Sequence, residues 1–356
     1  MFSHSKLVSL LLPPLECKNI AVFSKEPMSK LVTSLGFLSR ALKMKTILEF
    51  ASRTEQSPDQ VMRYLKSASK KYKVYSILKR THGRRIIAQP AKELKQYQNI
   101  FLDTHSLPVH SCAYAYKKGV SIKENAQQHV ENNYLLKMDL ENFFNSITPD
   151  ILWNQWEDHF GWKFQSIEKV LLEQTLFWST SKKLNRGKLV LSVGAPSSPA
   201  LSNLCMYSFD RELQEICQTY GVSYTRYADD LTFSTQLKGR LIKFPDYVEN
   251  LLNKHFSKKI LINNRKTVFT SKAHNRHVTG ITLANNGVIS LGRKRKRYIK
   301  HLMHQFILGN IDDEERMHLR GLLAFSNHIE PSFISTLRNK YGNDVVQRVS
   351  EVINEK

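Results

Sequence analysis

A chain of 356 residues with 41% hydrophobic content can bury a sizeable core, which excludes a disordered protein and leaves room for two or three packed subdomains. Lysine and arginine total 53 against 31 acidic residues, so the formal charge is +22 and a polyanion is the first partner to expect. The apolar stretch at residues 7–12 ends at Pro13, far short of the roughly 20 residues of a membrane span, and without a signal-peptide pattern we expect a cytoplasmic protein with no membrane partner.

The first 70 residues are expected to form helices. Leucines recur at steps of three and four from Leu31 to Leu42, which is the spacing of one apolar helix face. A second helix is predicted to begin after Ser57, an N-cap residue that is followed by Pro58 at the first helical position. We interpret these helices as a scaffold.

A basic segment with interleaved aromatic residues follows at residues 70–82. Tyr72 and Tyr75 lie within it, Gly83 punctuates it, and a short strand-like run then ends before Pro90. This pattern predicts a β-hairpin, which a helix over residues 91–102 is expected to follow.

The centre of the chain changes to strand patterns. Residues 134–140 form an apolar pattern with Asp139 near its end, which predicts a strand. Between residues 221 and 235, alternating side chains run into Asp229 and Asp230 and out again, which predicts two short antiparallel strands with a tight turn at the aspartates.

Asp139 and the Asp229-Asp230 pair are candidate metal ligands. Magnesium prefers oxygen ligands and keeps part of its water shell, so two or three carboxylates suffice where substrate phosphates supply the rest. Adjacent acids on a regular strand point to opposite faces, whereas the tip of a hairpin can turn both toward one site. Taken singly, the pair is more simply a polar turn and Asp139 a residue that precedes a helix. The surrounding sequence reverses that preference.

The blocks around these aspartates carry a specific resemblance. Tyr227-Ala228-Asp229-Asp230 resembles the Y-x-D-D box of reverse transcriptases, and four other blocks occur in the order of that family. They are RRI with Pro90 at residues 84–90, KMDLENFF at 137–144, GAPSSP with LSN at 194–203, and NNRKT at 263–267. Because five ordered blocks are rare by chance, the chain is identified as similar to reverse transcriptases.

The resemblance implies an α+β fold of the right-hand polymerase type, with an antiparallel palm sheet and a helical thumb. The implied divisions are an N-terminal helical region at 1–70, fingers at 71–133, a palm at 134–290 with a helical insertion at 151–190, and a thumb at 291–356. The implied activity is RNA-directed DNA polymerisation from dNTPs with two magnesium ions.

The family's site residues carry over to matching positions. The implied metal ligands are Asp139, Asp229, Asp230 and the backbone carbonyl of Leu140. The implied nucleotide contacts are Arg85, Phe144, Ala195 and Lys266. A guanidinium at Arg85 can bind phosphate oxygens in a bidentate manner, the ring of Phe144 would exclude a ribose hydroxyl, and Lys266 would contact or protonate the leaving pyrophosphate.

One position departs from the family pattern. Val193 stands where these enzymes often have a glutamine, immediately before the GAPSSP block. A valine side chain cannot form a hydrogen bond, so any nucleotide contact at this position must be apolar or made by the backbone.

Two further segments resemble motifs of bacterial retron reverse transcriptases, NAQQH at 125–129 and VTG at 278–280. Retron enzymes, as the resemblance implies, bind a structured noncoding RNA (msr-msd), prime from a 2′-hydroxyl of that RNA and make a branched RNA–DNA hybrid called msDNA. They act in bacterial anti-phage defence with a separate effector protein. The implied RNA contacts are Asn125, His129, Val278, Thr279 and Gly280, together with Arg293, Lys294, Arg295 and Arg297 of the basic run that opens the thumb.

Alternatives from other classes stay open. A group II intron reverse transcriptase shares the catalytic blocks but normally continues into a maturase domain, for which this chain has little room. A catalytically silent RNA-binding scaffold would retain the fold without the chemistry, and the intact aspartates disfavour it. A zinc nuclease is remote, because the two H-x-x-H pairs that begin at His274 and His301 have no neighbouring Cys or Glu ligand.

Overall fold

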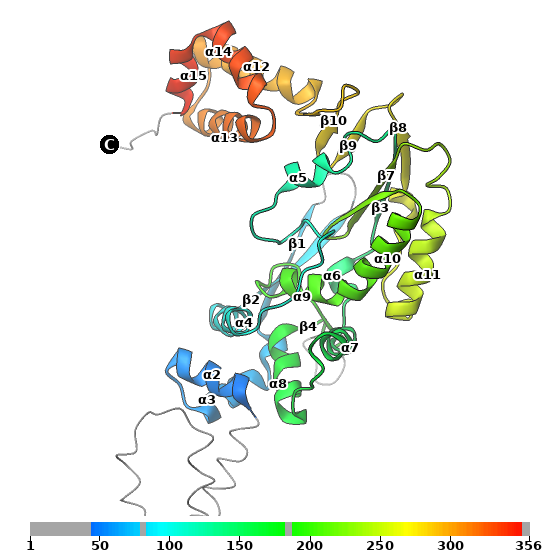
Figure 1. Cartoon of the computed structure of the whole chain (residues 1–356). Helices are drawn as coiled ribbons and strands as arrows, with labels where there is room; N and C mark the ends of the chain where they lie inside the picture. Colours follow the sequence, from blue (N-terminus) through cyan, green and yellow to red (C-terminus); the bar gives the residue numbers. More distant parts are fainter. Residues whose placement is uncertain (1–43, 79–82, 182–186, 351–356) are drawn as a thin grey trace, which may run out of the picture.

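The computed structural model describes residues 44–78, 83–181 and 187–350 (Figure 1). The helix predicted between Leu31 and Leu42 lies outside these residues, and so does the end of the basic segment at 79–82. Within the described ranges the chain forms an α+β fold with antiparallel sheets at its centre and helices at both ends.

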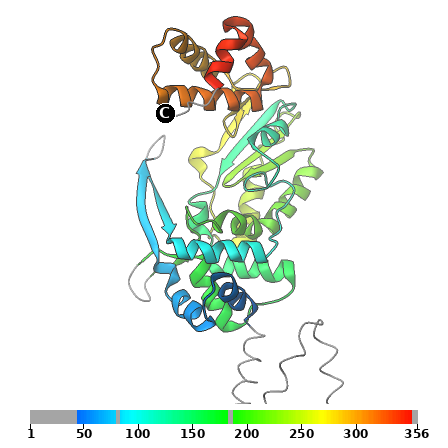
Figure 2. The same ribbon diagram turned by 90° about the vertical axis from the view of Figure 1, so that its left-hand side faces the viewer.

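The N-terminal part consists of helices and one β-hairpin. Its elements are α2 (Lys45–Thr54), α3 (Pro58–Leu65), the 3-10 helix η3 (Ala68–Lys70), β1 (Tyr72–Leu78), β2 (Arg84–Pro90) and α4 (Lys92–Thr104). α3 begins where predicted, because the Ser57 side chain accepts a hydrogen bond from Gln60 N and the Gln60 side chain accepts one from Ser57 N. The predicted hairpin is also confirmed, and it projects from the helices along one side of the molecule (Figure 2).

A four-stranded antiparallel sheet forms the centre, with the strand order β6-β7-β3-β8. The strands are β3 (Tyr134–Asp139), β6 (Ser223–Tyr227), β7 (Asp230–Thr235) and β8 (Val268–Ser271). Neighbouring residues of β3 enter different cores, since Leu136 packs with residues of α10 (Tyr207–Thr219) and α11 (Phe244–Phe256), whereas Leu135 packs with the C-terminal helices. Both faces of the sheet are therefore covered, and α10 and α11 lie together on one of them (Figure 1).

A helical insertion separates β3 from β6. It contains α6 (Phe143–Ser146), α7 (Pro149–Phe160), α8 (Ser166–Leu176), the strand pair β4 (Trp178–Ser179) and β5 (Leu189–Val190), and α9 (Ser198–Cys205). The Gln98 side chain on α4 donates a hydrogen bond of 2.8 Å to the Thr175 carbonyl on α8. Ser69 on η3 donates a hydrogen bond of 2.5 Å from Oγ to Oε1 of Gln174, which also lies on α8. These contacts attach the insertion to the N-terminal helices, beside which α8 lies in Figure 1.

A second sheet leads into a C-terminal helical body. The sheet has the order β11-β10-β9 and is formed by β9 (Arg276–Val278), β10 (Ile281–Leu283) and β11 (Ile289–Ser290). The helical body consists of α12 (Arg293–Ile307), α13 (Asp313–Ile329), α14 (Pro331–Tyr341) and α15 (Asn343–Ser350). Its core, around Leu302, Leu323 and Leu337, is shared with residues of β3, β9 and β10, and the body lies at the opposite end of the molecule from α2 and α3 (Figure 1). The expected α+β class, with an antiparallel sheet and C-terminal helices, is confirmed.

Membrane-spanning potential is absent from the described ranges. None of the helices in residues 44–78, 83–181 and 187–350 combines the length and the apolar character that a bilayer crossing requires.

Candidate active site

The three predicted aspartates meet at one end of the central sheet. Asp139 is the last residue of β3 and pairs directly with Asp230, the first residue of β7. The amide of Leu140 donates a hydrogen bond of 3.0 Å to the carbonyl of Asp229. Strand register therefore brings residues that are far apart in sequence to the same place.

The turn between β6 and β7 has two central residues, Ala228 and Asp229, because Tyr227 pairs with Asp230. Ala228 has a φ of 59°, which is the left-handed region that non-glycine residues rarely adopt. The predicted tight turn at the aspartates is confirmed. Its left-handed alanine could not be expected from the sequence, since alanine is not a typical residue for that conformation.

Negative charge accumulates around this turn. Burial, followed by the charge of Asp139, raises the pKa of Asp229 against the lowering effect of a backbone hydrogen bond. Asp230 keeps contact with solvent, yet partial loss of hydration, and then the charges of Asp229 and Asp139, raise its pKa to about 6. The folded site therefore disfavours full ionisation of its carboxylates unless a cation is near.

Lys266 is one such cation. It follows Asn264 and Arg265 in the 3-10 helix η4 (Asn264–Lys266), and its ammonium donates a hydrogen bond of 2.6 Å to Asp139 Oδ2. Asn263 donates from its side chain to Asp139 Oδ1 at 3.1 Å and from its amide to the Asp139 carbonyl at 2.7 Å. The NNRKT segment thus holds Asp139 in place from one side.

The donor set fits hard divalent cations. In the described residues no three Asp, Glu, His or Cys side chains converge tightly enough to share one ion, and the Asp139 carboxylate is paired with Lys266. Carboxylates that raise one another's pKa are nonetheless stabilised by a metal ion between them, and oxygen donors are what magnesium prefers. The backbone already places the three side chains together, and Leu140, the proposed carbonyl ligand, lines the same cavity as Asp139 and Asp229.

A cavity of about 500 Å³ opens in front of Asp139 and Asp229. Three of the four expected nucleotide contacts line it: Arg85 from β2, Phe144 from α6, and Lys266. The fourth, Ala195, lines an adjoining cavity of about 330 Å³ that also borders Phe144 and Val193. The structure therefore brings together all four residues, which come from four separate segments.

Tyr116 is a site residue that the sequence analysis missed. It lines both cavities, and its ring centroid lies 6.3 Å from that of Phe144. Its φ of 60° turns the chain sharply at this point. No pattern in the sequence marked Tyr116, because its place in the site depends on this turn and on the packing of the segment before it.

Three of the expected RNA contacts are corrected by the structure. Asn125, on α5 (Ile122–Gln127), His129 and Val278 are fully buried, so their side chains cannot reach an RNA surface in this fold. The His129 ring nitrogens lie 2.7 Å from the hydroxyl oxygens of Ser234 and Thr225, and burial lowers the pKa of His129 to about 3. His129 is therefore a neutral core residue that links the central sheet to the segment after α5.

The VTG segment is a turn. Val278 pairs with Ile281 across the β9–β10 hairpin, and the two residues between them have positive φ angles, 47° at Thr279 and 80° at Gly280. Such angles are those of the tight turns that favour glycine in hairpins. Asn125 Nδ2 lies 3.4 Å from Thr279 Oγ1, so the NAQQH and VTG segments contact each other.

The basic run lies beside this turn. A groove of about 1120 Å³ separates β9 and β10 from the first turn of α12, and no acidic residue is among its described lining residues. Lys272, Arg293 and Lys294 line it, while Arg295 donates a hydrogen bond of 3.3 Å to the Gly280 carbonyl. Arg297 is exposed but does not line the groove. The groove is a strongly basic surface next to the turn that carries Thr279 and Gly280.

A metal-binding test follows from the raised pKa of Asp230. Because burial and the charges of Asp229 and Asp139 raise the pKa of Asp230 to about 6, the contribution of Asp230 to stability should fall as pH rises through about 6 and stay low above it. Asp230→Asn should therefore raise the Tm by a few degrees at pH 8 in EDTA, and this gain should vanish below pH 4. Thermal melts followed by circular dichroism measure both values.

Added magnesium should raise the Tm of the wild type and have a smaller effect on Asp230→Asn, since a ligand that binds only the folded state stabilises it. Asp103→Asn, which changes an exposed carboxylate on α4, is the matched control and should respond to magnesium like the wild type. A wild-type Tm that does not respond to magnesium would contradict the metal site.

Comparison with known proteins extends these observations. The family model described as reverse transcriptase (RNA-dependent DNA polymerase) matches residues 77–283. The chain is 47% identical to the retron Ec83 reverse transcriptase of Escherichia coli over 79% of this chain and 90% of the relative. It is 29% identical to the retron Ec86 reverse transcriptase of the same species, over 86% of this chain and 93% of that one.

Solved structures show a more distant likeness. A telomerase from Candida albicans, in complex with a fragment of telomeric RNA, is 13% identical with a TM-score of 0.42, over 80% of this chain and 61% of that one. A foamy viral protease-reverse transcriptase in complex with double-stranded DNA is 14% identical with a TM-score of 0.41, over 78% of this chain and 43% of that one. Similarity at this level says nothing about individual residues.

Proposed function

Because this chain belongs to the retron group of the reverse transcriptase family, we propose that its RNA-directed DNA polymerase activity copies a cognate noncoding RNA (msr-msd) into branched msDNA. Synthesis would begin from a 2′-hydroxyl of that RNA. The observation that carries the catalytic part of the proposal is the pairing of Asp139 with Asp230 in front of a cavity lined by Arg85, Phe144 and Lys266. The retron part rests on the similarity to retron enzymes over most of the chain.

The metal ligands in this proposal are Asp139, Asp229, Asp230 and the Leu140 carbonyl. When bound there, two magnesium ions would lower the pKa of the attacking hydroxyl and neutralise charge on the triphosphate. The acidic side chains keep their positions through strand register and through the Asn263 contacts to Asp139.

The remaining side chains act on the nucleotide. Arg85 would bind triphosphate oxygens through its planar guanidinium. The hydroxyl oxygen attacks the α-phosphorus, the bond to pyrophosphate breaks, and Lys266 would donate a proton to the departing group. Phe144 would pack against the sugar and exclude a 2′-hydroxyl, while Ala195 would support the nucleotide from the adjoining cavity.

The division into fingers, palm and thumb is part of the proposal. Residues 71–133 would be the fingers, 134–290 the palm and 291–356 the thumb, after an N-terminal helical region at 1–70. Two observations support these boundaries: β3 begins at Tyr134 and α12 begins at Arg293. The contacts of α8, within the insertion at 151–190, with Ser69 on η3 and Gln98 on α4 support an assignment of this insertion beside the fingers.

The basic groove between β9, β10 and α12 is the proposed path of the RNA and of the RNA–DNA hybrid. Lys272, Arg293 and Lys294 line it, and none of its described lining residues is acidic, which suits a phosphate backbone. Thr279 and Gly280 at the hairpin turn are the part of the VTG segment that remains accessible. We further expect the protein to act in the bacterial cytoplasm, in a complex with a separate effector protein of anti-phage defence. Its membership of the retron group supports this expectation.

Isolation of nucleic acid from cells that express the chain with its cognate RNA tests the proposal. A single-stranded DNA that migrates faster after treatment with RNase and with a 2′–5′ debranching enzyme is the expected product. Primer extension on poly(rA) with oligo(dT) measures polymerisation separately. Extension of the oligo(dT) primer without any branched product would contradict the retron function and leave the polymerase function standing.

A further inference from the structure

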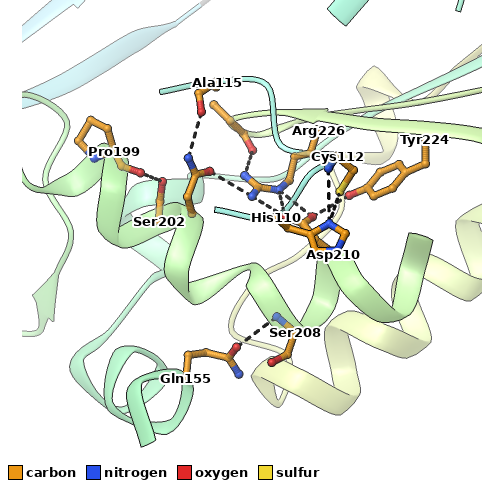
Figure 3. Close-up of polar contacts among 12 residues, drawn as sticks. His110, Cys112, Ala115, Gln155, Pro199, Ser202, Ser208, Asp210, Tyr224 and Arg226 are labelled. Carbon is orange, nitrogen blue, oxygen red and sulfur yellow. Dashed lines mark hydrogen bonds and ion pairs between the residues drawn. The ribbon is translucent and has the colours of Figure 1, made fainter. Parts of the chain in front are cut away.

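Arg226 lies next to the catalytic turn and has no place in the mechanism above. It is the residue before Tyr227 on β6, and its guanidinium is fully buried (Figure 3). An unpaired buried charge would strongly destabilise the fold, so the partners of this group show what it does there.

The guanidinium donates hydrogen bonds to three partners. Nε and Nη2 donate to the Asp210 carboxylate on α10 at distances down to 2.6 Å, which forms a bidentate ion pair. Nη2 also donates to Asn203 Oδ1 on α9 at 3.1 Å, and Nη1 donates to the Ala228 carbonyl at 3.1 Å. Burial opposes the charged form, but the charge of Asp210 outweighs this effect and the pKa of Arg226 rises.

The contact with Ala228 bears on the metal site. Ala228 is the left-handed residue of the β6–β7 turn, and Asp229 and Asp230 follow it directly. A non-glycine residue adopts this conformation only when surrounding contacts impose it. The hydrogen bond from Arg226 to the Ala228 carbonyl is such a contact, and Asp210 and Asn203 fix the guanidinium that makes it.

The same network reaches a second wall of the nucleotide cavity. Asn203 donates from Nδ2 to the Ala115 carbonyl at 3.0 Å, immediately before Tyr116 (Figure 3). The Arg226 carbonyl accepts a hydrogen bond of 2.8 Å from the Tyr114 amide. Arg226 therefore links the β6–β7 turn, which carries the aspartates, to the segment that positions Tyr116.

We propose that Arg226 is a positioning residue for DNA synthesis, which acts by holding the Ala228 carbonyl so that the turn presents Asp229 and Asp230 beside Asp139. Asp210 and Asn203 orient its guanidinium. This proposal rests on the catalytic role of the three aspartates stated above.

Arg226→Lys tests the proposal, because lysine retains a charge for Asp210 but cannot also serve Asn203 and Ala228 in the fork geometry of a guanidinium. We expect kcat for dTTP incorporation on poly(rA) with oligo(dT) to fall by about 5- to 30-fold, the factor equivalent to the cost of a left-handed alanine. The KM for dTTP should stay within about 2-fold, since the residues that bind the nucleotide are unchanged.

Ala228→Gly in the Arg226→Lys background provides the decisive comparison. Glycine adopts positive φ without the side-chain penalty, so it should restore most of the lost kcat. A role of Arg226 in core stability alone predicts no such recovery. Tyr224→Phe is the matched control, because Tyr224 donates to Asp210 Oδ1 at 3.0 Å and its hydroxyl has no described hydrogen bond to the turn. It should lower the Tm and leave kcat within about 2-fold of wild type.

Two outcomes overturn the proposal. A folded Arg226→Lys with wild-type kcat overturns the proposal, and so does a loss of kcat that Ala228→Gly leaves unchanged. If Arg226→Lys shows no cooperative melt, Asn203→Ser with and without Ala228→Gly replaces it, with the same expected recovery. Asp229→Asn with Asp230→Asn serves as reference: if that variant still synthesises DNA, the proposed site fails, whereas an inactive reference beside a normal Arg226→Lys refutes only the present inference.

Discussion

Asp229→Asn combined with Asp230→Asn should reduce DNA synthesis by about 1,000-fold or more, the factor that corresponds to losing several kcal/mol of metal-supplied charge stabilisation. Asp229 lies in the β6–β7 turn, and Asp230 follows the turn and pairs with Asp139. Asparagine keeps the size of each side chain and removes its charge. The fold should therefore persist, and its Tm in EDTA should rise, because the variant carries no charge on which burial and the repulsion by neighbouring carboxylates, the causes that raise the pKa of both aspartates, can act.

Primer extension on poly(rA) with oligo(dT) measures the loss, and filter binding with labelled RNA measures the retained affinity. Binding should be unchanged, since the basic groove beside α12 does not include the aspartates. Asp246→Asn, on the first turn of α11, is the control for a neutralised aspartate outside the site and should polymerise normally. Full synthesis by the double variant would refute the assignment of the active site.

Phe144→Ala should allow the enzyme to incorporate ribonucleotides. The Phe144 ring borders both cavities and faces Tyr116, so its removal opens space beside the sugar. The ratio of kcat/KM for dTTP to that for UTP is expected to fall by about 10- to 200-fold, the range in which a pocket discriminates by the size of one small group. Most of the change should come from improved use of UTP, because the steric obstacle concerns the 2′-hydroxyl.

The neighbouring Phe143 offers a matched control. It is buried in the main core and, although it borders the nucleotide cavity, it does not line the adjoining cavity as Phe144 does, so Phe143→Leu should lower the Tm and leave the selection against ribonucleotides unchanged. If both variants lose selectivity equally, the effect arises from general loosening of α6 and Phe144 is no gate. Steady-state incorporation of each nucleotide on the same primer distinguishes these results.

The burial of Asn125, His129 and Val278 in the NAQQH and VTG segments changes how RNA recognition can be interpreted. Asn125 contacts Thr279, and His129 binds two hydroxyls of the central sheet, so these segments set the position of the β9–β10 hairpin. The hairpin in turn forms one wall of the basic groove. A substitution in either segment would therefore affect RNA binding by changing the shape of that wall. We therefore propose that direct RNA contact is made by the exposed residues around the groove, such as Arg293 and Lys294.

The sequence by itself determined the strands around Asp139, Asp229 and Asp230 and the hairpin turn that carries two of them, because strand alternation and turn chemistry act over a few residues. The N-cap at Ser57 and the helices after Arg293 were predictable for the same reason. The role proposed for these aspartates, and the cavity-lining segments other than that of Tyr116, came from the resemblance of five ordered blocks to reverse transcriptases, since the aspartate pair taken singly is a polar turn.

Tertiary structure alone decided which polar residues are buried and which are free to bind a partner. His129, Asn125 and Arg226 are polar in sequence, yet each is enclosed by segments about 100 residues or more away or by another helix. Tyr116 enters the active site through a left-handed turn that no composition predicts. Exposure depends on how distant segments pack, and packing between them is a property of the whole fold that no short window of sequence contains.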